Sequence, residues 1–297
     1  MSGLVECVPN VSEGRRPEVV RGLADVVTAV PGVRLLDVTS DPDHNRSVLT
    51  FAGEADAVES AALALVAAAF AKIDMRTHTG EHPRLGAVDV VPFVPLSGST
   101  MEECVAIAKR VGRAVAAAHE VPVYYYAKAA TRPERVRLPD IRKPQYEGLQ
   151  ELMSTTHAPD EGPSRLHPGA GAIVIGARPP LIAFNIELDT TDVKLAQRIA
   201  KEIRESSGGL PGVQAKGFQL TDPIRAQVSF NLLDHSVTSL GTVWREVETR
   251  AAAVGVRILR GELIGLAPLE AMLDVARESL RLEGLVRTQI IEGHFIQ

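Results

Sequence analysis

The alternation of two hydrophobic periodicities constrains the fold of this chain most strongly. Directly adjacent strand-like segments at 33–38 and 47–51, joined by a turn, favour antiparallel pairing over a doubly wound parallel sheet. Strand-like and helix-like segments of the first half, in chain order, cover residues 4–9, 15–30, 33–38, 47–51, 54–73, 87–94, 99–119 and 121–126. A capping-box pattern at Ser99 and Glu102 predicts the start of the third helix.

The second half repeats the same order of segments. Its strand-like segments cover residues 172–175, 181–188, 218–220, 227–232 and 256–264, and its helix-like segments cover 192–206, 240–254 and 269–280. We therefore predict an α+β protein with two ferredoxin-like βαββαβ subdomains, residues 1–178 and 179–297. Each is expected to have a mixed or antiparallel sheet with helices packed on one face.

Residues 128–170 differ in kind from both halves. They hold six of the 19 prolines, and six cations precede Tyr146: Lys128, Arg132, Arg135, Arg137, Arg142 and Lys143. Such a segment fits a solvated connection between domains. It also fits a segment that covers a ligand and whose cations attract an anionic substrate.

Composition excludes several classes of protein. The 32 basic and 37 acidic residues give a net charge of −5, which argues against nucleic-acid and membrane-surface binding. The longest uncharged apolar run, residues 61–71, is too short to span a bilayer. Cys7 and Cys104 are the only cysteines, so we expect core residues of a reduced protein. With no signal-peptide pattern at the start, we expect a cytoplasmic location.

The densest group of titratable side chains lies in residues 78–89. His78 and His82 suggest a metal site, but Gly80 interrupts the helix that such spacing needs, and Pro83 excludes His82 from the α region. We therefore expect no metal. Pro83 also fixes the backbone of His82, and an imidazole with a pKa near 6.5 can accept and return a proton at neutral pH. His82 is the predicted general acid/base.

Other polar positions are compatible with less specific roles. Asn10 follows the first strand in a turn-forming segment, and Asp37, Asn45 and Arg46 flank the turn between the second and third strands. The glycine-rich approach at residues 162–172 is no phosphate loop, because no Lys-Ser or Lys-Thr follows it.

Several segments together resemble one known family. The strongest match is residues 80–95, which read Gly-Glu-His-Pro-Arg-Leu-Gly-Ala-Val-Asp-Val-Val-Pro-Phe-Val-Pro. Further matching segments are residues 4–14, 35–38, 45–46, 74–75, 158–160, 162–164, 176–178, 181–185, 227–229 and 231–234. On these residues the chain resembles the glutamate formimidoyltransferase family over essentially its whole length.

The resemblance implies an activity and its substrates. Members transfer the formimidoyl group from N-formimidoyl-L-glutamate to N5 of tetrahydrofolate in histidine degradation, with tetrahydrofolate as co-substrate. They have two similar subdomains that enclose a folate groove. Animal members are fused to a cyclodeaminase, so here a cyclodeaminase acting downstream would be a separate protein. We expect a homodimer and no nucleic-acid or membrane partner.

The resemblance also implies the residues of the site. His82 corresponds to the general acid/base of the Gly-Glu-His-Pro-Arg motif. The predicted folate-binding stretch supplies Gly162, Pro163, Ser164, Pro168, Gly169, Ala170, Gly171 and Ala172. Further predicted substrate or folate contacts are Arg84, Asn10, Asp37, Asn45, Arg46 and Asn185. Two departures from the family pattern are Thr39, where an acid is expected, and residues 165–167.

Four alternatives stay open at this point. Formyl transfer between 5-formyltetrahydrofolate and glutamate needs the same groove and base. A non-catalytic folate or amino-acid binding module would use the same halves without turnover. A metal-dependent amidohydrolase would use the histidines as ligands. RNA binding by a ferredoxin-like sheet needs exposed aromatic residues, and Tyr124, Tyr125 and Tyr126 form a single run.

Overall fold

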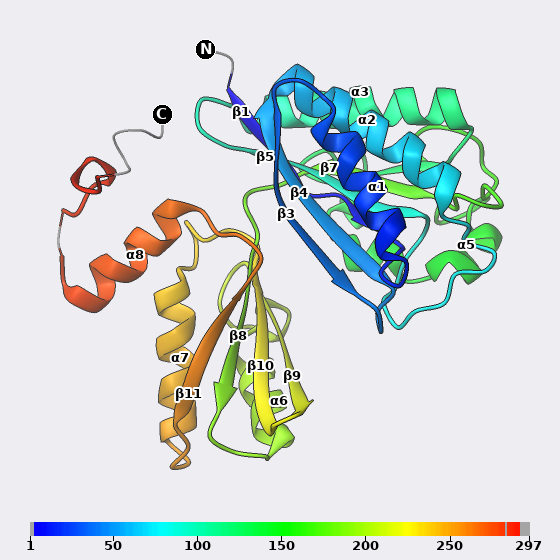
Figure 1. The fold of residues 1–297 in the computed structure, drawn as a ribbon. Coiled ribbons are helices and arrows are strands. Elements are labelled where there is room, and N and C mark those ends of the chain that lie inside the picture. The colour runs from blue at the N-terminus through cyan, green and yellow to red at the C-terminus, as the bar shows by residue number, and fades with distance from the viewer. Residues whose placement is uncertain (1–2, 283, 292–297) are drawn as a thin grey trace. The chain divides into compact units, whose positions relative to one another are not determined.

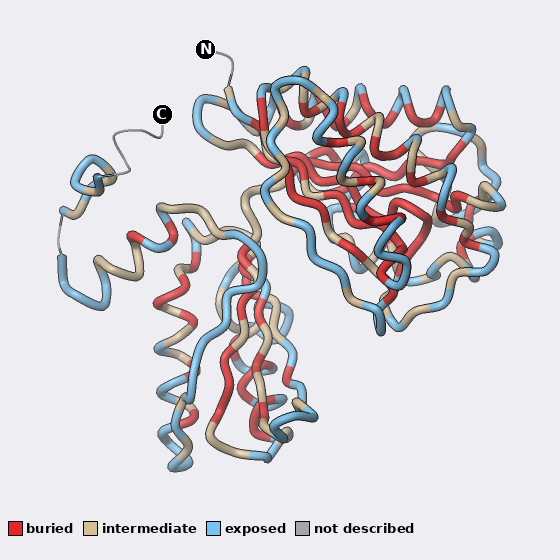
Figure 2. Tube along the Cα trace, in the orientation of Figure 1, coloured by how far each residue is buried: buried red, intermediate tan, exposed pale blue. Residues whose placement is uncertain are grey.

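The computed structural model describes residues 3–282 and 284–291 of the 297-residue chain. The chain divides into two compact units, Met1–Arg178 and Pro179–Gln297 (Figure 1). Each unit has its own sheet and its own hydrophobic core, so the predicted α+β class with two subdomains is confirmed. Figure 2 shows how buried residues concentrate on the strands of each sheet and on the helix faces that cover them.

The N-terminal unit has a seven-stranded mixed sheet. β1 and β2 lie between β4 and β5, β3 pairs with β4 at one edge, and β7 and β6 continue in parallel beyond β5. The elements are β1 (Leu4–Cys7), β2 (Asn10–Val11), α1 (Pro17–Thr28), β3 (Val33–Asp41), β4 (Arg46–Glu54), α2 (Ala55–Lys72), β5 (Val88–Pro95), α3 (Met101–His119), β6 (Val123–Ala127) and β7 (Ile173–Ala177). Helices α1, α2 and α3 cover one face of this sheet with an aliphatic core.

Local sequence signals explain the helix starts. Pro17 opens α1, where its missing N–H costs nothing, and the Glu13 carboxylate accepts hydrogen bonds from the backbone N–H groups of Arg15 and Arg16. α3 has a full capping box, but on Thr100 and Glu103. The prediction on Ser99 and Glu102 was therefore wrong by one residue. The Ser99 hydroxyl instead donates to the carbonyl of Leu4 at 2.6 Å.

Residues 128–170 fold against the second face of the same sheet. They form a 3₁₀ turn (Pro133–Arg135), α4 (Leu138–Arg142) and α5 (Gln145–Leu152). Tyr124 and Tyr126 point to this face and pack with Ile141, Leu149 and Met153. The interpretation as a solvated connection is therefore wrong, and the expectation of helices on one face holds for α1 to α3 but not for α4 and α5.

The three consecutive tyrosines are core residues. Tyr125 alternates to the other face, where its ring lies against Gly112 of α3. All three are buried. An RNA-binding sheet needs exposed aromatics, so the structure contradicts that alternative for these residues. Cys7 and Cys104 are also buried and unpaired, as predicted for core residues.

The C-terminal unit has a four-stranded antiparallel sheet in the order β11-β8-β10-β9. Its elements are β8 (Ile182–Leu188), α6 (Val193–Ile203), a 3₁₀ turn (Glu205–Ser207), β9 (Val213–Thr221), β10 (Ile224–Leu232), α7 (Leu240–Ala252), β11 (Ile258–Ile264), α8 (Leu269–Leu280) and a second turn (Arg287–Gln289). This strand order is the ferredoxin-like βαββαβ order that the sequence predicts. Helices α6 and α7 pack with its buried face (Figure 1). Across the described residues, no helix combines the length and apolarity needed to cross a bilayer.

Candidate active site

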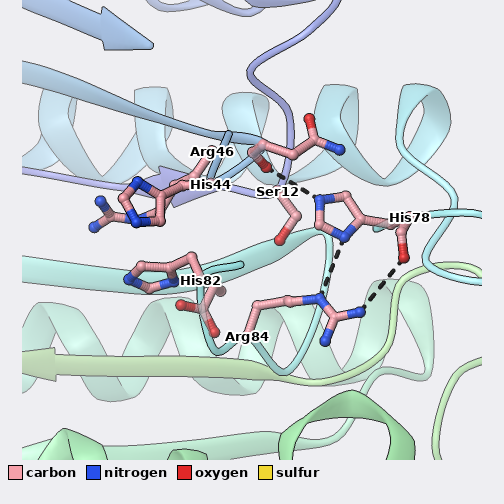
Figure 3. A pocket seen from close by; sticks show the side chains of 8 residues that line it. Ser12, His44, Arg46, His78, His82 and Arg84 are labelled. Carbon is pink, nitrogen blue, oxygen red and sulfur yellow. Dashed lines mark hydrogen bonds between the residues drawn. The ribbon is translucent and has the colours of Figure 1, made fainter. Parts of the chain in front are cut away.

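A polar pocket in the N-terminal unit brings together side chains from four segments. It lies where β2 ends, β4 begins and the segment between α2 and β5 approaches them, and it is partly open to solvent (Figure 3). Its lining residues are Ser12, His44, Asn45, Arg46, His78, His82, Arg84 and Asp89. Three predicted contacts, Asn45, Arg46 and Arg84, therefore lie with His82 in one pocket.

Backbone contacts hold the segment that carries His82. The N–H of Ala172 donates to the carbonyl of Leu85 at 3.0 Å, and the N–H of Ala87 donates to the carbonyl of Ala170 at 2.9 Å. Gly80 approaches the turn before β4 so closely that a Cβ there would meet the carbonyl oxygen of His44 at 2.4 Å. Only glycine fits at this position, and the contact fixes the distance between the segment and the turn.

The His82 imidazole is held in its neutral form. Burial lowers its pKa first, and the nearby positive charges of Arg46 and Arg142, with His44, lower it further, to about 3. The ring is half-buried and lines the pocket. A neutral imidazole at pH 7 has a free lone pair, so His82 can accept a proton.

Two arginines lie near His82, and they have different partners. Arg142 of α4 forms an ion pair with the buried Asp89 of β5, and Arg46 donates to the side-chain oxygen of Asn10. The Nε–H groups of both arginines are buried and have no hydrogen-bond partner among the described residues. Burial and the charge of Arg142 lower the pKa of Arg46 to about 10. The pocket wall therefore carries the charge of Arg46, whose described side-chain hydrogen bond is to an amide rather than to a carboxylate, and this charge suits an anion.

His78 and Arg84 form a rigid part of the wall. Arg84 donates through Nε to Nδ1 of His78 at 3.2 Å, and Nε2 of His78 lies 3.1 Å from the carbonyl oxygen of Asn45. Because Nδ1 accepts, Nε2 carries the proton and His78 is neutral; burial lowers its pKa. The guanidinium of Arg84 also forms a two-point ion pair with Glu147, with its closest approach at 2.6 Å. Arg84 is therefore already neutralised by a carboxylate of α5.

The structure also places the three other polar side chains predicted as contacts in the N-terminal unit, Asn10, Asn45 and Asp37. Asn10 is buried at the start of β2 and holds Arg46. Asn45 accepts from the N–H of Gly14 and donates to the carbonyl of Thr79, each at 2.9 Å, and so ties the pocket to the start of α1 and to the His82 segment. Asp37 lies on β3 opposite Thr50 and is not part of the pocket lining given above. Thr39 is exposed on the same strand.

The glycine-rich stretch supports the His82 segment with its backbone. Gly171 adopts a φ of +74°, and a Cβ there would meet the carbonyl oxygen of Leu85 at 2.4 Å. Gly162 has a φ of +81° and lies against the carbonyl of Val121. None of the predicted folate residues between 162 and 172 belongs to the pocket lining given above. Their role in folate binding stays a prediction.

Asn185 lies in the other unit. It is on the face of β8 opposite to Phe184 and Ile186, which pack in the core, and its side-chain amide donates to Glu262 of β11 at 3.2 Å. The predicted groove between the subdomains also stays a prediction.

Four of the six cations between residues 128 and 143 form ion pairs with three aspartates of the N-terminal unit. Arg135 is buried in an ion pair with Asp160, and both Arg137 and Lys143 pair with Asp140. Of the four cations for which a partner is described, only Arg142 reaches the pocket wall, through Asp89. The interpretation of this row as an attractor for anionic substrates stays a prediction.

Sequence reasoning assigned no individual role to four contributors to the site: Ser12, His44, Asp89 and Arg142. Asp89 stood only within the group at residues 78–89, and Arg142 only within the row of cations. Ser12 donates to the carbonyl of Gly86 at 2.7 Å and so joins β2 to the His82 segment. One feature of the sequence could have indicated a role for His44: an aspartate stands three residues before it in a proline-containing turn. Arg142 and Asp89 are 53 positions apart, and no local pattern connects them.

A metal has no evident set of ligands in the described ranges. No group of three or more His, Cys, Asp or Glu side chains there could hold a metal ion. Both ring nitrogens of His78 are already in hydrogen-bond contact. The expectation of a metal-free site stays a prediction.

Comparison with known proteins identifies the class. Residues 4–178 match the formiminotransferase domain, N-terminal subdomain, and residues 183–294 match the formiminotransferase domain. The chain therefore belongs to the formiminotransferase family, which confirms the resemblance seen in the motifs.

Full-length relatives make the comparison more specific. The chain is 44% identical over 298 residues to glutamate formimidoyltransferase of Streptococcus pyogenes serotype M1, with 100% of both chains covered. It is 44% identical to glutamate formimidoyltransferase of Thermoplasma acidophilum, covering 97% of this chain and 96% of the relative. It is 46% identical to formimidoyltransferase-cyclodeaminase of Rattus norvegicus, covering 93% of this chain and 52% of that longer protein.

Proposed function

We propose that this protein is a tetrahydrofolate-dependent glutamate formimidoyltransferase. The observation that carries the proposal is the 44% identity to the streptococcal enzyme of that name over the full length of both chains. The pocket of the N-terminal unit supports it, because it combines a neutral imidazole with surplus positive charge. The reaction is the transfer of a formimidoyl group from N-formimidoyl-L-glutamate to N5 of tetrahydrofolate.

His82 has the chemistry that this transfer needs. N5 of tetrahydrofolate attacks the amidine carbon and forms a C–N bond, and the proton of N5 passes to the imidazole. The tetrahedral intermediate then breaks its bond to the glutamate nitrogen, and His82 returns the proton to that leaving nitrogen. One histidine thus serves as base and then as acid, a role worth roughly 10²- to 10⁴-fold in rate. The products are 5-formimidoyltetrahydrofolate and glutamate.

The arginines adjust the proton affinity of His82 to the substrate. In the free protein Arg46 and Arg142 lower the pKa of His82 to about 3, which keeps the base unprotonated but weak. A substrate carboxylate bound in the pocket beside Arg46 offsets these charges and raises the pKa towards neutrality. The base becomes effective only once the anionic substrate is bound.

The remaining contacts follow from the family resemblance. Asn10 holds the side chain of Arg46, and the backbone carbonyl of Asn45 and the guanidinium of Arg84 hold the ring of His78. We assign Asp37, Asn185 and the glycine-rich stretch 162–172 to substrate or folate contacts outside this pocket. In the cell we expect a cytoplasmic homodimer that acts in histidine degradation, followed by a separate cyclodeaminase.

A direct assay tests the proposal. The purified protein is incubated with tetrahydrofolate and N-formimidoyl-L-glutamate, and formation of 5-formimidoyltetrahydrofolate is followed spectroscopically. A parallel reaction replaces these substrates with 5-formyltetrahydrofolate and glutamate. Formimidoyl transfer with a higher kcat/KM supports the proposal. Formyl transfer alone would replace it with the rival activity, and folate binding without either product would make the protein a binding module.

A further inference from the structure

Asp41 and His44 form a clamped pair at the turn between β3 and β4. One carboxylate oxygen of Asp41 accepts from the backbone N–H groups of Asp43 and His44, each at 2.9 Å. The other oxygen lies 2.5 Å from Nδ1 of the His44 ring. Backbone and side chain of His44 are therefore both tied to one carboxylate, which leaves Nε2 as the free end of the ring.

The clamped ring lies against His82. The centroids of the two imidazoles are 6.0 Å apart and their planes make an angle of 86°, a T-shaped contact (Figure 3). The main chain reinforces this contact, because the N–H of Glu81 donates to the carbonyl of Asp43 at 3.3 Å. The turn and the His82 segment are thus joined by a main-chain hydrogen bond as well as by the ring contact.

Charged and titratable side chains from several elements surround the two imidazole rings. Arg46 of β4 and Arg142 of α4 face His82, Asp89 of β5 pairs with Arg142, and His78 and Arg84 complete the wall. Burial raises the pKa of Asp41, but its hydrogen bonds and attraction to His44 outweigh burial and lower the pKa overall. Asp41 is therefore ionised at neutral pH and favours a proton on Nδ1 of His44.

We propose that Asp41 and His44 act as a positioning pair for His82, holding its imidazole plane in the orientation needed for proton transfer. The inference rests on the proposed function and extends it to two residues on the turn before β4. His44 is also one of the neighbours whose charge lowers the pKa of His82, from a ring-centroid distance of 6.0 Å. His44 contacts the base rather than the reacting atoms, so its role is positioning and electrostatic.

Two substitutions of His44 separate these effects. His44→Phe keeps a ring against His82 but removes the charge and the bond to Asp41, whereas His44→Ala removes the ring as well. We expect His44→Ala to lower kcat about 10-fold with KM within about 3-fold, since orientation of a catalytic group affects the transition state. We expect His44→Phe to keep kcat within about 3-fold of the wild type, and Asp41→Asn to lie between the two.

The pH profile gives a readout that a merely structural role would not move. His44→Phe removes a positive neighbour 6.0 Å from His82 and therefore raises the pKa of His82. In a plot of kcat against pH, the fall in kcat on the acid side should then occur about 0.5 pH unit or more higher than in the wild type. His119→Ala is the matched control, because His119 makes a T-shaped contact of 5.3 Å and 87° with Phe70 in the same unit. That variant should leave kcat and its pH profile unchanged.

Imidazole NMR titration of the free protein tests the inference without turnover. The expected result is a higher titration midpoint for His82 in His44→Phe than in the wild type. The positioning role would be overturned if the midpoint of His82 were unchanged in His44→Phe, or if His44→Ala kept the kcat of the wild type. In either case, formimidoyl transfer by the wild-type protein would still uphold the proposed function. If the wild type transfers no formimidoyl group, the proposed function fails, and the NMR midpoint alone decides whether His44 acts on His82.

Discussion

The two units share one strand order but differ in what covers their sheets. Part of the N-terminal sheet has four neighbouring positions, occupied in order by β5, by β1 together with β2, by β4 and by β3. The C-terminal sheet has the same arrangement, with β11, β8, β10 and β9 in these positions. The N-terminal unit adds α3, β6 and β7, and then α4 and α5 on the second face. It therefore has core residues on both sides of its sheet.

The added layer changes where charges lie. In the N-terminal unit Arg135 and Asp160 are paired with side chains only 4% and 5% exposed. In the C-terminal unit the Arg257 side chain, paired with Asp189, is 84% exposed. Glu187 is an exception there, because it is buried although its partner Arg260 is exposed. A second covering layer thus creates an interior in which paired charges can be desolvated, and the His82 pocket lies in that unit.

The sharpest functional contrast is between His82 and Asn185, one in each unit. We expect His82→Ala to lower kcat by roughly 10²- to 10⁴-fold, because it removes the acid/base, with the Kd for tetrahydrofolate largely unchanged. Asn185→Ala removes a hydrogen-bonding group from the C-terminal unit. This variant should raise KM by roughly 5-fold, which corresponds to the free energy of about one hydrogen bond. Steady-state kinetics and equilibrium binding of tetrahydrofolate measure both.

His119→Ala serves as the control for this contrast, since His119 lies at the end of α3 outside the pocket lining. Wild-type turnover in His82→Ala would refute the general acid/base assignment. A fall in kcat rather than a rise in KM for Asn185→Ala would place the chemistry in both units.

The next contrast concerns stability. Arg135→Met leaves Asp160 buried and unpaired, so we expect a loss of about 3–5 kcal/mol in the free energy of unfolding of the N-terminal unit. Arg257→Met removes an exposed pair and should change stability by less than about 0.5 kcal/mol. All four tyrosines lie in the N-terminal unit and the only tryptophan, Trp244, lies in the C-terminal unit. Denaturant unfolding followed by tyrosine circular dichroism and by tryptophan fluorescence therefore reports each unit separately.

An equal loss of stability for the two variants would show that burial of the Arg135 pair has no energetic consequence. A loss confined to the tryptophan signal in Arg135→Met would contradict the division of the chain into two units.

Local sequence patterns predict most of the fold of both units. The segments expected as strands and helices correspond to β1, to β3 through β11 and to α1, α2, α3, α6, α7 and α8, because each has a periodicity that its own residues determine. The two-residue strand β2 (Asn10–Val11) was expected as part of a turn. Helices α4 and α5 are short and lie among prolines, so composition favours a loop there. Only packing against Tyr124 and Tyr126 makes these residues helical parts of the core.

The site was predictable only where the motif is local. His82 and Arg84 stand in one recognisable segment, and both line the pocket. The pairs Arg142 with Asp89 and Arg84 with Glu147 join residues 53 and 63 positions apart. Such contacts depend on how the second layer folds back, which no spacing along the chain encodes. His44 reaches His82 for the same reason, through the close approach of Gly80 to the turn.

The smallest expected effect is a pH dependence that belongs to the N-terminal unit alone. Unfolded His82 has a pKa near 6.5, and in the folded protein burial and Arg46 with Arg142 lower it to about 3. Between these values the unfolded state binds a proton that the folded state does not, so the free energy of unfolding falls as pH decreases from 6.5 towards 3.

His82→Gln removes this contribution. Between pH 7 and pH 5 we expect the stability of the wild-type N-terminal unit to fall by about 1–2 kcal/mol more than that of the variant, the lower value reflecting solvent screening of a half-buried ring. The tyrosine signal should show this difference, while the tryptophan signal should be the same in both proteins. If wild type and His82→Gln lose equal stability by the tyrosine signal, His82 titrates normally in the free protein, and the buried arginines do not control its protonation.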